Sequence, residues 1–338
     1  MHNTTGQLIM TGLPGTDLDD DTLSLIENNG ISNFILFRRN ACRGQAALTA
    51  LVKKLCRVCI GAGLPEPIIA TDQEGGEVQR LGPPHWQAIP SNRAATVADA
   101  PETSVARQAE TAAEILSSSG INMNLAPVLD IASPDMDAFL ENRCYGTDPA
   151  CVSRAGDIYI RTIQARGIAA AAKHFPGIGR VKSDPHYNRP VVTCPPEILL
   201  QETAPFQTGI SSGVMAVMTS HVIFTGLDPH HPATFSRIIA RDLLRRSMGF
   251  KGVLFTDDLE MAGIALYDHI GDAAVKAFVA GHDILLICHR ASKVREVLEA
   301  LDTARRQGIL TDGMIQRSLD RIGRLRKNIN KTCGQQTI

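Results

Sequence analysis

The chain has no excess of positive charge and no long hydrophobic run. Its 338 residues contain 34 Lys and Arg against 35 Asp and Glu, which gives a formal net charge of -1. Proteins that bind the phosphate backbone of nucleic acids usually carry a basic patch, and no cluster of Lys and Arg suggests such binding here. No apolar run approaches the ~18 residues that a membrane-spanning helix requires. The sequence therefore argues against nucleic acid and membranes as partners.

Targeting and redox signals are also missing. The N-terminal MHNTTGQLIMTGLPG has no Lys or Arg before its short apolar run, so it lacks the charged region of a secretory signal. The CxxC formed by Cys56 and Cys59 falls within a helical pattern and has no second CxxC or HxxxH beside it, which favours two ordinary helix cysteines over a zinc or redox site. We expect a cytoplasmic protein that needs no cofactor and whose scattered thiols are reduced. The eight cysteines are at positions 42, 56, 59, 144, 151, 194, 288 and 333.

Short apolar runs recur along the chain, although no sequence repeat is present. Each run is bounded by turn residues, and most are followed by a longer segment with helical spacing, which is typical of strands alternating with helices. The apolar runs cover residues 7–10, 33–37, 67–71, 122–126, 168–172, 214–218, 253–255 and 283–287. The helical segments cover residues 46–62, 102–119, 151–165, 196–211, 235–247, 273–280, 292–307 and 312–328.

This alternation predicts an α/β fold, a single (β/α)₈ TIM-type barrel. Strands that alternate with helices form right-handed βαβ units, and eight such units close into a barrel. A doubly wound open sheet is the alternative, but no GxGxxG follows the first run. Since no linker or composition shift is visible, we expect one domain over residues 1–338.

Polar residues follow most of the predicted strands. In a parallel barrel the carboxyl ends of the strands meet at one mouth, where reactive residues gather. We therefore expect these groups to converge: Asp72-Gln73-Glu74-Gly75-Gly76 after the third strand, the loop from Glu141 to Gly146 after the fourth, Lys173-His174 at the fifth, Thr219-Ser220-His221 at the sixth, and Thr256-Asp257-Asp258 at the seventh.

The loop after the fifth strand carries Asp184-Pro185-His186. Pro185 fixes its own φ and pushes Asp184 toward an extended conformation, in which residues two apart project to the same side. Asp184 and His186 can therefore meet. A carboxylate bonded to one imidazole nitrogen sets the tautomer of the other, as a general acid/base histidine requires. The alternative is a surface loop with incidental polar residues.

Asp257 and Asp258 are expected to differ in role. Successive strand residues point to opposite sides, so Asp257 is the better candidate for the substrate side and Asp258 for the N-terminus of a following helix. The alternative is that both are caps or surface carboxylates. A carboxylate that faces a His/Asp pair matches retaining glycoside hydrolysis, in which one group attacks the anomeric carbon and the other protonates the leaving oxygen.

Fixed charges at the mouth are candidates for sugar recognition, although each could equally form a salt bridge at the barrel rim. Gly75 and Gly76 would let the backbone approach a ligand closely. His221 is as well suited to packing as to substrate contact, and His230 and His231 are expected in a loop. The charged candidates are Asp72, Arg80, Arg143 and Lys173.

Two other functions fit part of this pattern. A metal-dependent hydrolase could use the ligands His174, His186, His221 and Asp257, but Lys173 beside His174 would repel a cation. A sugar-binding protein without activity would need the recognition groups but not the Asp184/His186 pair.

Several motifs in matching order make the chain resemble glycoside hydrolase family 3, in particular its single-domain bacterial β-N-acetylglucosaminidases of peptidoglycan recycling. The resemblance implies that Asp257 is the nucleophile, that His186 paired with Asp184 is the acid/base, and that five residues hold the N-acetylglucosamine ring: Asp72, Arg80, Arg143, Lys173 and His174. The motifs are Ile35-Leu36-Phe37 with Arg39-Asn40, Asp72 to Gly76 with Val78-Gln79-Arg80, Asn124 to Asp130, Lys173 to Gly177, Met218 to Val222, and Phe255 to Leu259.

The resemblance implies a retaining exo-β-N-acetylhexosaminidase, acting on N-acetylglucosamine-terminated glycosides such as peptidoglycan-derived muropeptides. Relatives that cleave plain glucosides usually take their acid from a second domain, whereas here Asp184 and His186 would supply it from the barrel. The alternatives are a β-glycosidase of other sugar specificity and a phosphorylase, since a neutral histidine repels phosphate less than a carboxylate does. Glu77, Ile178, Pro185 and Arg189 depart from the family pattern, which leaves the aglycone open.

Overall fold

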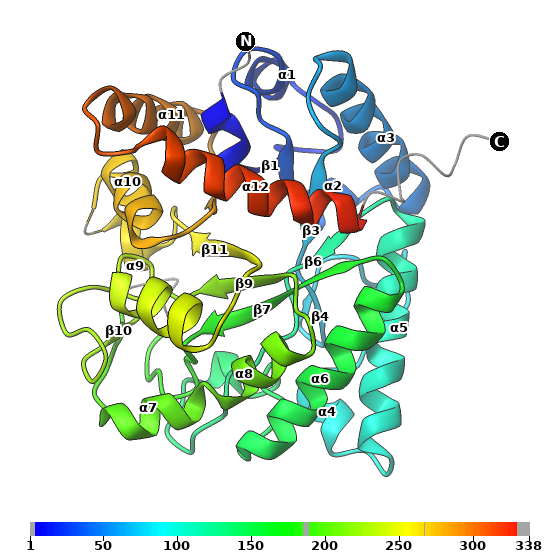
Figure 1. The fold of residues 1–338 in the computed structure, drawn as a ribbon. Coiled ribbons are helices and arrows are strands. Elements are labelled where there is room, and N and C mark those ends of the chain that lie inside the picture. Colours follow the sequence, from blue (N-terminus) through cyan, green and yellow to red (C-terminus); the bar gives the residue numbers. More distant parts are fainter. Residues whose placement is uncertain (1–3, 185–188, 267, 330–338) are drawn as a thin grey trace.

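Eight parallel strands close into a barrel at the centre of the molecule (Figure 1). The computed structural model describes residues 4–184, 189–266 and 268–329. Each predicted apolar run coincides with one barrel strand, so the predicted (β/α)₈ barrel is confirmed. Around the barrel the strands follow the order β1 (Ile9–Gly12), β12 (Ile284–Ile287), β11 (Val253–Asp258), β9 (Ala216–Thr219), β7 (Ala169–Phe175), β6 (Met123–Asn124), β3 (Ile68–Thr71) and β2 (Asn33–Leu36).

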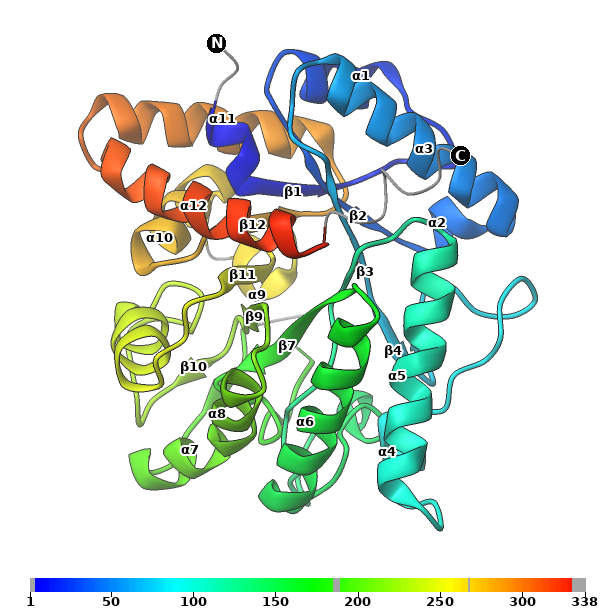
Figure 2. The same cartoon turned by 45° about the vertical axis from the view of Figure 1, so that its right-hand side comes forward.

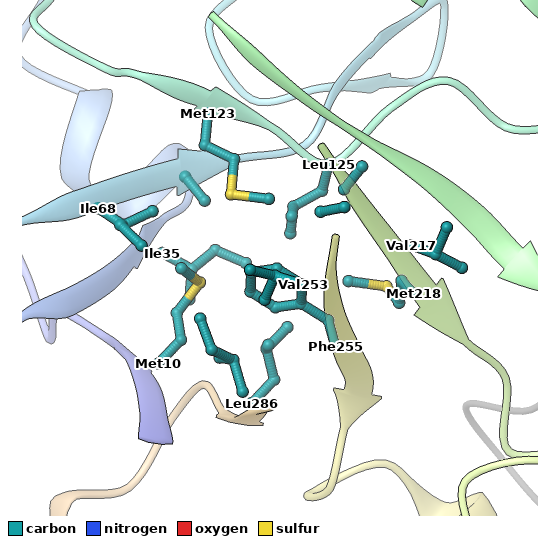
Figure 3. Close-up of a cluster of buried hydrophobic side chains, with 14 of the residues drawn as sticks. Met10, Ile35, Ile68, Met123, Leu125, Val217, Met218, Val253, Phe255 and Leu286 are labelled. Carbon is teal, nitrogen blue, oxygen red and sulfur yellow. The ribbon is translucent and has the colours of Figure 1, made fainter. Parts of the chain in front are cut away.

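The barrel strands are apolar along nearly their whole length because helices cover the outer face while side chains fill the interior. Every residue of β2, β3, β7, β9 and β12 is buried. Figure 3 shows the interior side chains meeting, with Met10, Ile35 and Leu286 on one side and Met218 and Phe255 on the other. The interior is therefore a packed core, and a ligand can enter only at an end of the barrel.

The helices form the outer layer of the barrel (Figures 1 and 2). The longer ones are α1 (Asp20–Glu27), α3 (Gln45–Gly61), α5 (Pro101–Ser118), α6 (Pro149–Ala165), α8 (Ala204–Ser211), the π-helix η3 (Ile238–Ser247), α10 (Ile270–Ala280), α11 (Ala291–Arg306) and α12 (Asp312–Ile329). The shorter ones are η1 (Thr4–Leu8), α2 (Arg38–Ala41), α4 (Asn92–Thr96), η2 (Ala138–Leu140), α7 (Pro196–Glu202) and α9 (Ala262–Ala265). Two small sheets pair β4 (Gln73–Gly75) with β5 (Val78–Gln79) and β8 (Val191–Val192) with β10 (Ile223–Phe224).

Local sequence signals account for the ends of several helices. Asp19 caps α1 by accepting from Thr22 N, and α6 begins at Pro149 directly after its cap Asp148. The predicted helix over residues 196–211 is instead two helices, since Pro205 has no N–H and fits only in the first turn of α8. No helix in the described ranges is long and apolar enough to cross a membrane. The seven cysteines within those ranges are free thiols.

The last helix, α12, covers the N-terminal end of the barrel and packs against η1, β7 and β11. Its buried Arg326 donates from Nη2 to Ser32 Oγ and Asn33 Oδ1, each at 2.7 Å, and from Nη1 to Gln7 Oε1 at 3.0 Å. Burial lowers the pKa of Arg326 to about 10. Because these acceptors precede or begin strands β1 and β2, α12 closes this end and leaves the opposite end for a site.

Candidate active site

A cavity of about 330 Å³ opens at the carboxyl ends of the barrel strands. It is lined from several directions, by Phe37 after β2, Asp72 after β3, His174 on β7, Asp257 on β11 and His289 after β12. The structure brings the predicted residues Asp72, Arg80, Arg143, Lys173, His174 and Asp257 together in this one cavity.

A chain of ion pairs forms the floor of the cavity. Lys173 Nζ lies 2.7 Å from both Asp72 Oδ1 and Glu74 Oε1. Arg80 Nη2 donates to Asp72 Oδ2 at 3.1 Å, and Arg143 binds Glu74 with Nε and Nη2, both at 2.8 Å. Three cations and two carboxylates therefore hold one another in place, so the salt bridges expected for these residues are present, and their role in sugar recognition stays a prediction.

The ion pairs keep these buried groups charged. Burial by itself would raise the pKa of Asp72, but Lys173 and Arg80 hold it well below its ordinary range. Burial likewise opposes ionisation of Glu74, yet Arg143 and Lys173 lower its pKa to about 2. Burial lowers the pKa of Lys173, and the two carboxylates outweigh this effect and raise it. At neutral pH these groups are therefore charged and already held in position, so they could form hydrogen bonds to a polar ligand without rearrangement.

Glu74 lies in the segment that was expected at the mouth, but it was not among the residues expected to bind the sugar. Its side chain is 1% exposed and joins Lys173 to Arg143. It lies two residues after Asp72 in an extended segment, and residues two apart share one side. This spacing is the signal that could have found it.

Gly75 and Gly76 have a different role from the expected close approach to a ligand. They have φ values of 103° and 59°, and a Cβ on them would lie 2.2 Å from Pro90 O and 2.7 Å from Ser91 Cβ. These glycines therefore permit the turn between β4 and β5 and its packing against residues 90–91, which indirectly fixes Asp72 and Glu74.

A buried carboxylate orients His174. Asp130 Oδ2 accepts from His174 Nδ1 at 2.8 Å, while its Oδ1 accepts from the backbone N–H groups of His174 and Ile178 at 3.1 and 2.9 Å. Since Nδ1 carries the proton of this hydrogen bond, Nε2 is the nitrogen that remains for a ligand. Asp130 was not among the predicted site residues, although it ends the Asn124 to Asp130 motif.

The two aspartates at the end of β11 both line the cavity, and Asp258 is the more buried. Asp257 Oδ1 accepts from the backbone N–H of Asp258 at 2.8 Å. Asp258 Oδ1 accepts from Glu260 N at 3.0 Å and Cys288 N at 3.3 Å. The expected helix cap at Asp258 is wrong, because residues 259–261 form a turn and α9 begins at Ala262. Asp258 instead ties the end of β11 to the segment after β12.

His221 is not among the residues that line the cavity. Its ring is buried, with Nε2 2.8 Å from the carbonyl oxygen of Asp258 and Nδ1 2.7 Å from Thr234 Oγ1. Burial lowers its pKa, so the ring is neutral, and Nε2 must carry the proton because a carbonyl oxygen only accepts. His221 therefore positions the backbone at Asp258, while His230 and His231 are exposed loop residues as expected.

His289 is a second cavity residue that the sequence analysis missed. Its Nε2 lies 3.3 Å from Asp258 Oδ2, and its ring centroid lies 5.5 Å from that of Phe37. Arg39 contacts both rings. Its guanidinium carbon lies 4.5 Å from the Phe37 centroid, and its Nη1 lies 3.4 Å from His289 Nδ1. Because His289 follows β12, the rule that strand exits meet at the mouth would have found it.

His186 and Pro185 lie outside the described residues, so the pairing of His186 with Asp184 stays a prediction. Asp184 is half-buried. Arg189, which departs from the family pattern, donates to Asp268 Oδ2 at 2.8 Å and to Gly263 O at 2.6 Å. Its charge is therefore paired with a carboxylate and is not simply added to the mouth. Glu77 is exposed on the turn between β4 and β5.

The described residues offer little support for the metal-dependent alternative. Within them, no three His, Cys, Asp or Glu side chains are grouped as ligands for a metal ion. His221 uses both ring nitrogens in hydrogen bonds, and Nδ1 of His174 is bonded to Asp130. Of these two histidines, His221 has no ring nitrogen left for a metal ion, whereas His174 keeps Nε2.

The model of the glycosyl hydrolase family 3 N-terminal domain matches residues 1–325. The chain belongs to glycoside hydrolase family 3. Among curated relatives of this family 3 enzyme, a β-hexosaminidase of Xanthomonas oryzae pv. oryzae is 31% identical over 318 residues, which is 92% of each chain. A β-hexosaminidase of Stenotrophomonas maltophilia is 32% identical over 321 residues.

Solved structures of family 3 members have the same fold. A β-N-acetylglucosaminidase from Paenibacillus sp. matches 97% of this chain with a TM-score of 0.94 and 36% identity, and this chain spans 62% of that longer one. A β-N-acetylhexosaminidase from Beutenbergia cavernae matches 96% of this chain and 97% of its own, with a TM-score of 0.88 and 31% identity. The enzyme is thus a glycoside hydrolase, as its motifs predicted.

Proposed function

We propose that this family 3 enzyme is a retaining exo-β-N-acetylhexosaminidase that removes terminal N-acetylglucosamine. The observation that carries the proposal is the single cavity in which Asp257 lies together with Asp72, Lys173, Arg143 and His174. A carboxylate beside fixed hydrogen-bonding charges suits attack on a sugar whose hydroxyls are held in place. The names of the Xanthomonas, Paenibacillus and Beutenbergia relatives support an N-acetylhexosamine as that sugar.

Asp257 is the proposed nucleophile. Its carboxylate attacks the anomeric carbon and forms a glycosyl ester while the glycosidic oxygen leaves with a proton from His186, which Asp184 orients. In the second step His186 takes a proton from water, the water oxygen attacks the anomeric carbon, and the ester bond to Asp257 breaks. Two displacements give net retention. The hydrogen bond from Asp258 N fixes the orientation of the Asp257 carboxylate for the attack.

The floor of the cavity is the proposed sugar site. An ammonium group has three N–H donors, and Lys173 uses two of them on Asp72 and Glu74, which leaves one for a sugar hydroxyl. Asp72 can accept from a second hydroxyl, and His174 Nε2 can accept from a third. Arg80 and Arg143 complete the set. The natural substrates we propose are peptidoglycan-derived muropeptides in the cytoplasm, with residues 1–338 acting as one domain without a cofactor.

A panel of aryl β-glycosides tests the sugar and the acceptor. We expect rapid hydrolysis of the 2-acetamido glucoside and slow hydrolysis of the plain glucoside, with water preferred over phosphate. Similar rates on both sugars would indicate a β-glycosidase of other specificity. Release of the sugar 1-phosphate when phosphate is added would indicate a phosphorylase.

A fluorinated glycoside tests the covalent step. A 2-deoxy-2-fluoro or 5-fluoro glycoside should slow breakdown of the glycosyl-enzyme, and peptide mapping should find the adduct between Val253 and Met261. If no adduct forms and a thiazoline mimic of the acetamido intermediate inhibits strongly, the substrate's own acetamido group is the nucleophile and the assignment of Asp257 is wrong.

A further inference from the structure

A second cavity, of about 360 Å³, lies at the end of the barrel opposite the active site. His282, just before β12, lines this cavity, whereas Cys288 and His289, just after β12, line the active-site cavity. The remaining walls come from η3, α10 and α12, and Figures 1 and 2 both show α10 and α12 side by side. Five arginines line it: Arg241, Arg245, Arg246, Arg317 and Arg321.

Asp283, a buried carboxylate beside this cavity, accepts four hydrogen bonds. Asp283 accepts at Oδ2 from Arg245 Nη2 at 2.6 Å and from Leu254 N at 3.0 Å. At Oδ1 it accepts from Ser318 Oγ at 2.7 Å and from Arg321 Nη1 at 3.0 Å. Two guanidinium groups thus share the single negative charge of Asp283. The four donors occupy the acceptor sites of its two carboxylate oxygens.

The other three arginines carry more positive charge than their neighbours neutralise. Arg246 pairs with Asp242 at 2.7 Å on the exposed surface. Among the described residues, no carboxylate forms an ion pair with Arg241 or Arg317. Burial lowers the pKa of Arg241, and the charges of Arg237, Arg317 and Arg246 lower it further. The guanidinium groups therefore repel one another, and an anion between them would relieve this repulsion.

The backbone around the cavity makes room for Arg241. Gly281, at φ 129°, ends α10, and a Cβ there would lie 3.0 Å from Arg241 Cγ. The missing side chain lets the Arg241 stem lie against the backbone and extend its guanidinium along the cavity. His282 adds no charge, because its Nδ1 donates to Ala277 O, its Nε2 lies 2.8 Å from Thr219 Oγ1, and burial lowers its pKa to about 3.

We propose that this cavity binds a small, multiply charged phosphate anion, an oligophosphate such as pyrophosphate or the phosphate chain of a nucleotide, through Arg241 and Arg317. Guanidinium groups bind phosphate oxygens bidentately, and arginines from two helices can grip one anion from both sides. Five guanidinium groups face only the two carboxylates of Asp283 and Asp242, which leaves an excess of positive charge. This excess suits an anion with several negative charges better than a single chloride. The site is independent of the glycosidase cavity, from which β12 separates it.

Thermal unfolding and calorimetric titration with sodium pyrophosphate test the proposal, with sodium chloride added to keep the ionic strength constant. We expect pyrophosphate to raise the melting temperature of the enzyme by several degrees and to bind at a ratio of one per chain. Adenosine triphosphate should compete with it. If neither anion raises the melting temperature above the value in sodium chloride of equal ionic strength, the arginines are simply solvated and the proposal is wrong.

Charge-neutralising variants locate the site. Arg241→Gln with Arg317→Gln should weaken pyrophosphate binding at least tenfold and, without anion, melt at or above the wild-type temperature, because a repulsion has been removed. The control is Arg154→Gln with Arg161→Gln on α6, two exposed arginines that should leave binding unchanged. Glycosidase activity should be normal in both. The single, exposed Arg317→Gln gives the same comparison if the double variant does not fold.

Two outcomes would overturn the assignment. Equal stabilisation of wild type and the double variant by pyrophosphate would place the anion elsewhere, for example on Lys173 and Arg143. Binding to phosphatidylcholine vesicles that contain phosphatidic acid, without any response to soluble pyrophosphate, would make the source of the phosphate a lipid headgroup instead of a soluble anion.

Discussion

Replacing Lys173 by Met tests whether the ion pairs of Lys173 with Asp72 and Glu74 stabilise the fold. The Lys173 side chain is 3% exposed and its ammonium touches both Asp72 and Glu74 at 2.7 Å. Methionine keeps most of the side-chain volume but removes the shared cation. Breaking a buried ion pair by removing one partner costs about 3–5 kcal/mol. After the substitution Asp72 still pairs with Arg80 and Glu74 with Arg143, but each buried carboxylate has lost one of its two cations.

This free energy corresponds to a measurable shift in melting temperature. With an unfolding entropy of about 2.1 cal/mol/K per residue, a chain of 338 residues changes by roughly 0.7 kcal/mol per degree near its midpoint. The variant Lys173→Met should therefore melt about 4–7 °C below wild type at pH 7. Lys54→Met is the matched control, since Lys54 pairs with Asp17 at an exposed site and its loss should leave the melting temperature nearly unchanged.

The pH dependence gives a second check. The folded-state pKa values of Asp72 and Glu74 are depressed, that of Glu74 to about 2, so their stabilisation is present above the unfolded values of about 4 and is lost as the pH falls through the folded values. Without Lys173 each carboxylate keeps one cation and loses the other, so both pKa values are higher than in wild type and the folded variant takes up protons at a higher pH. The difference in melting temperature between wild type and variant should therefore be largest at pH 7 and should narrow as the pH falls below about 4, toward the folded-state pKa values. A variant that melts within 1 °C of wild type at pH 7, or a difference that widens on acidification, would refute this reasoning.

Three further predictions concern the chemistry. Asp257→Ala should lower kcat by several orders of magnitude while its far-ultraviolet circular dichroism and melting temperature stay close to wild type, and near-normal activity would assign the nucleophile elsewhere. His186→Ala should slow glycosides with poor leaving groups far more than activated aryl glycosides, and Asp184→Asn should do the same to a smaller extent. The matched control His174→Ala should slow both kinds of substrate alike. If the two histidine variants show the reverse pattern, the acid is His174, which is bonded to Asp130. EDTA should leave activity intact, and a loss that zinc restores would instead support a metal-dependent hydrolase.

The barrel was predictable because its determinants are local. A strand that is covered on both faces must be apolar along its length. Each of the eight apolar runs can therefore be recognised in the sequence independently of the others. The parallel topology then puts every carboxyl end at the same mouth, so the grouping of Asp72, Lys173 and Asp257 followed from topology without any distance. Where a local signal was overlooked, as with Pro205 inside the segment 196–211, the predicted element was wrong.

The partners within the site depended on tertiary contacts. The sequence places Glu74 near Asp72 but does not show that it bridges Lys173 and Arg143, which are 99 and 69 residues away and reach it only because the barrel closes. The same applies to Asp130 and His174 and to the contact of His289 with Asp258.

The arginine cavity shows this division most clearly. The sequence determined that η3 and α12 are helices and that each carries arginines, which singly are typical of a solvated surface. Only the packing of α12 across the barrel end brings Arg317 to Arg241, more than 70 residues earlier in the chain, and gives Asp283 to Arg245 and Arg321. Helices and strands are determined by the pattern of residues that are neighbours in the sequence. The net charge of a cavity depends on which side chains from distant segments come together in it. That arrangement is set only when the helices and strands pack.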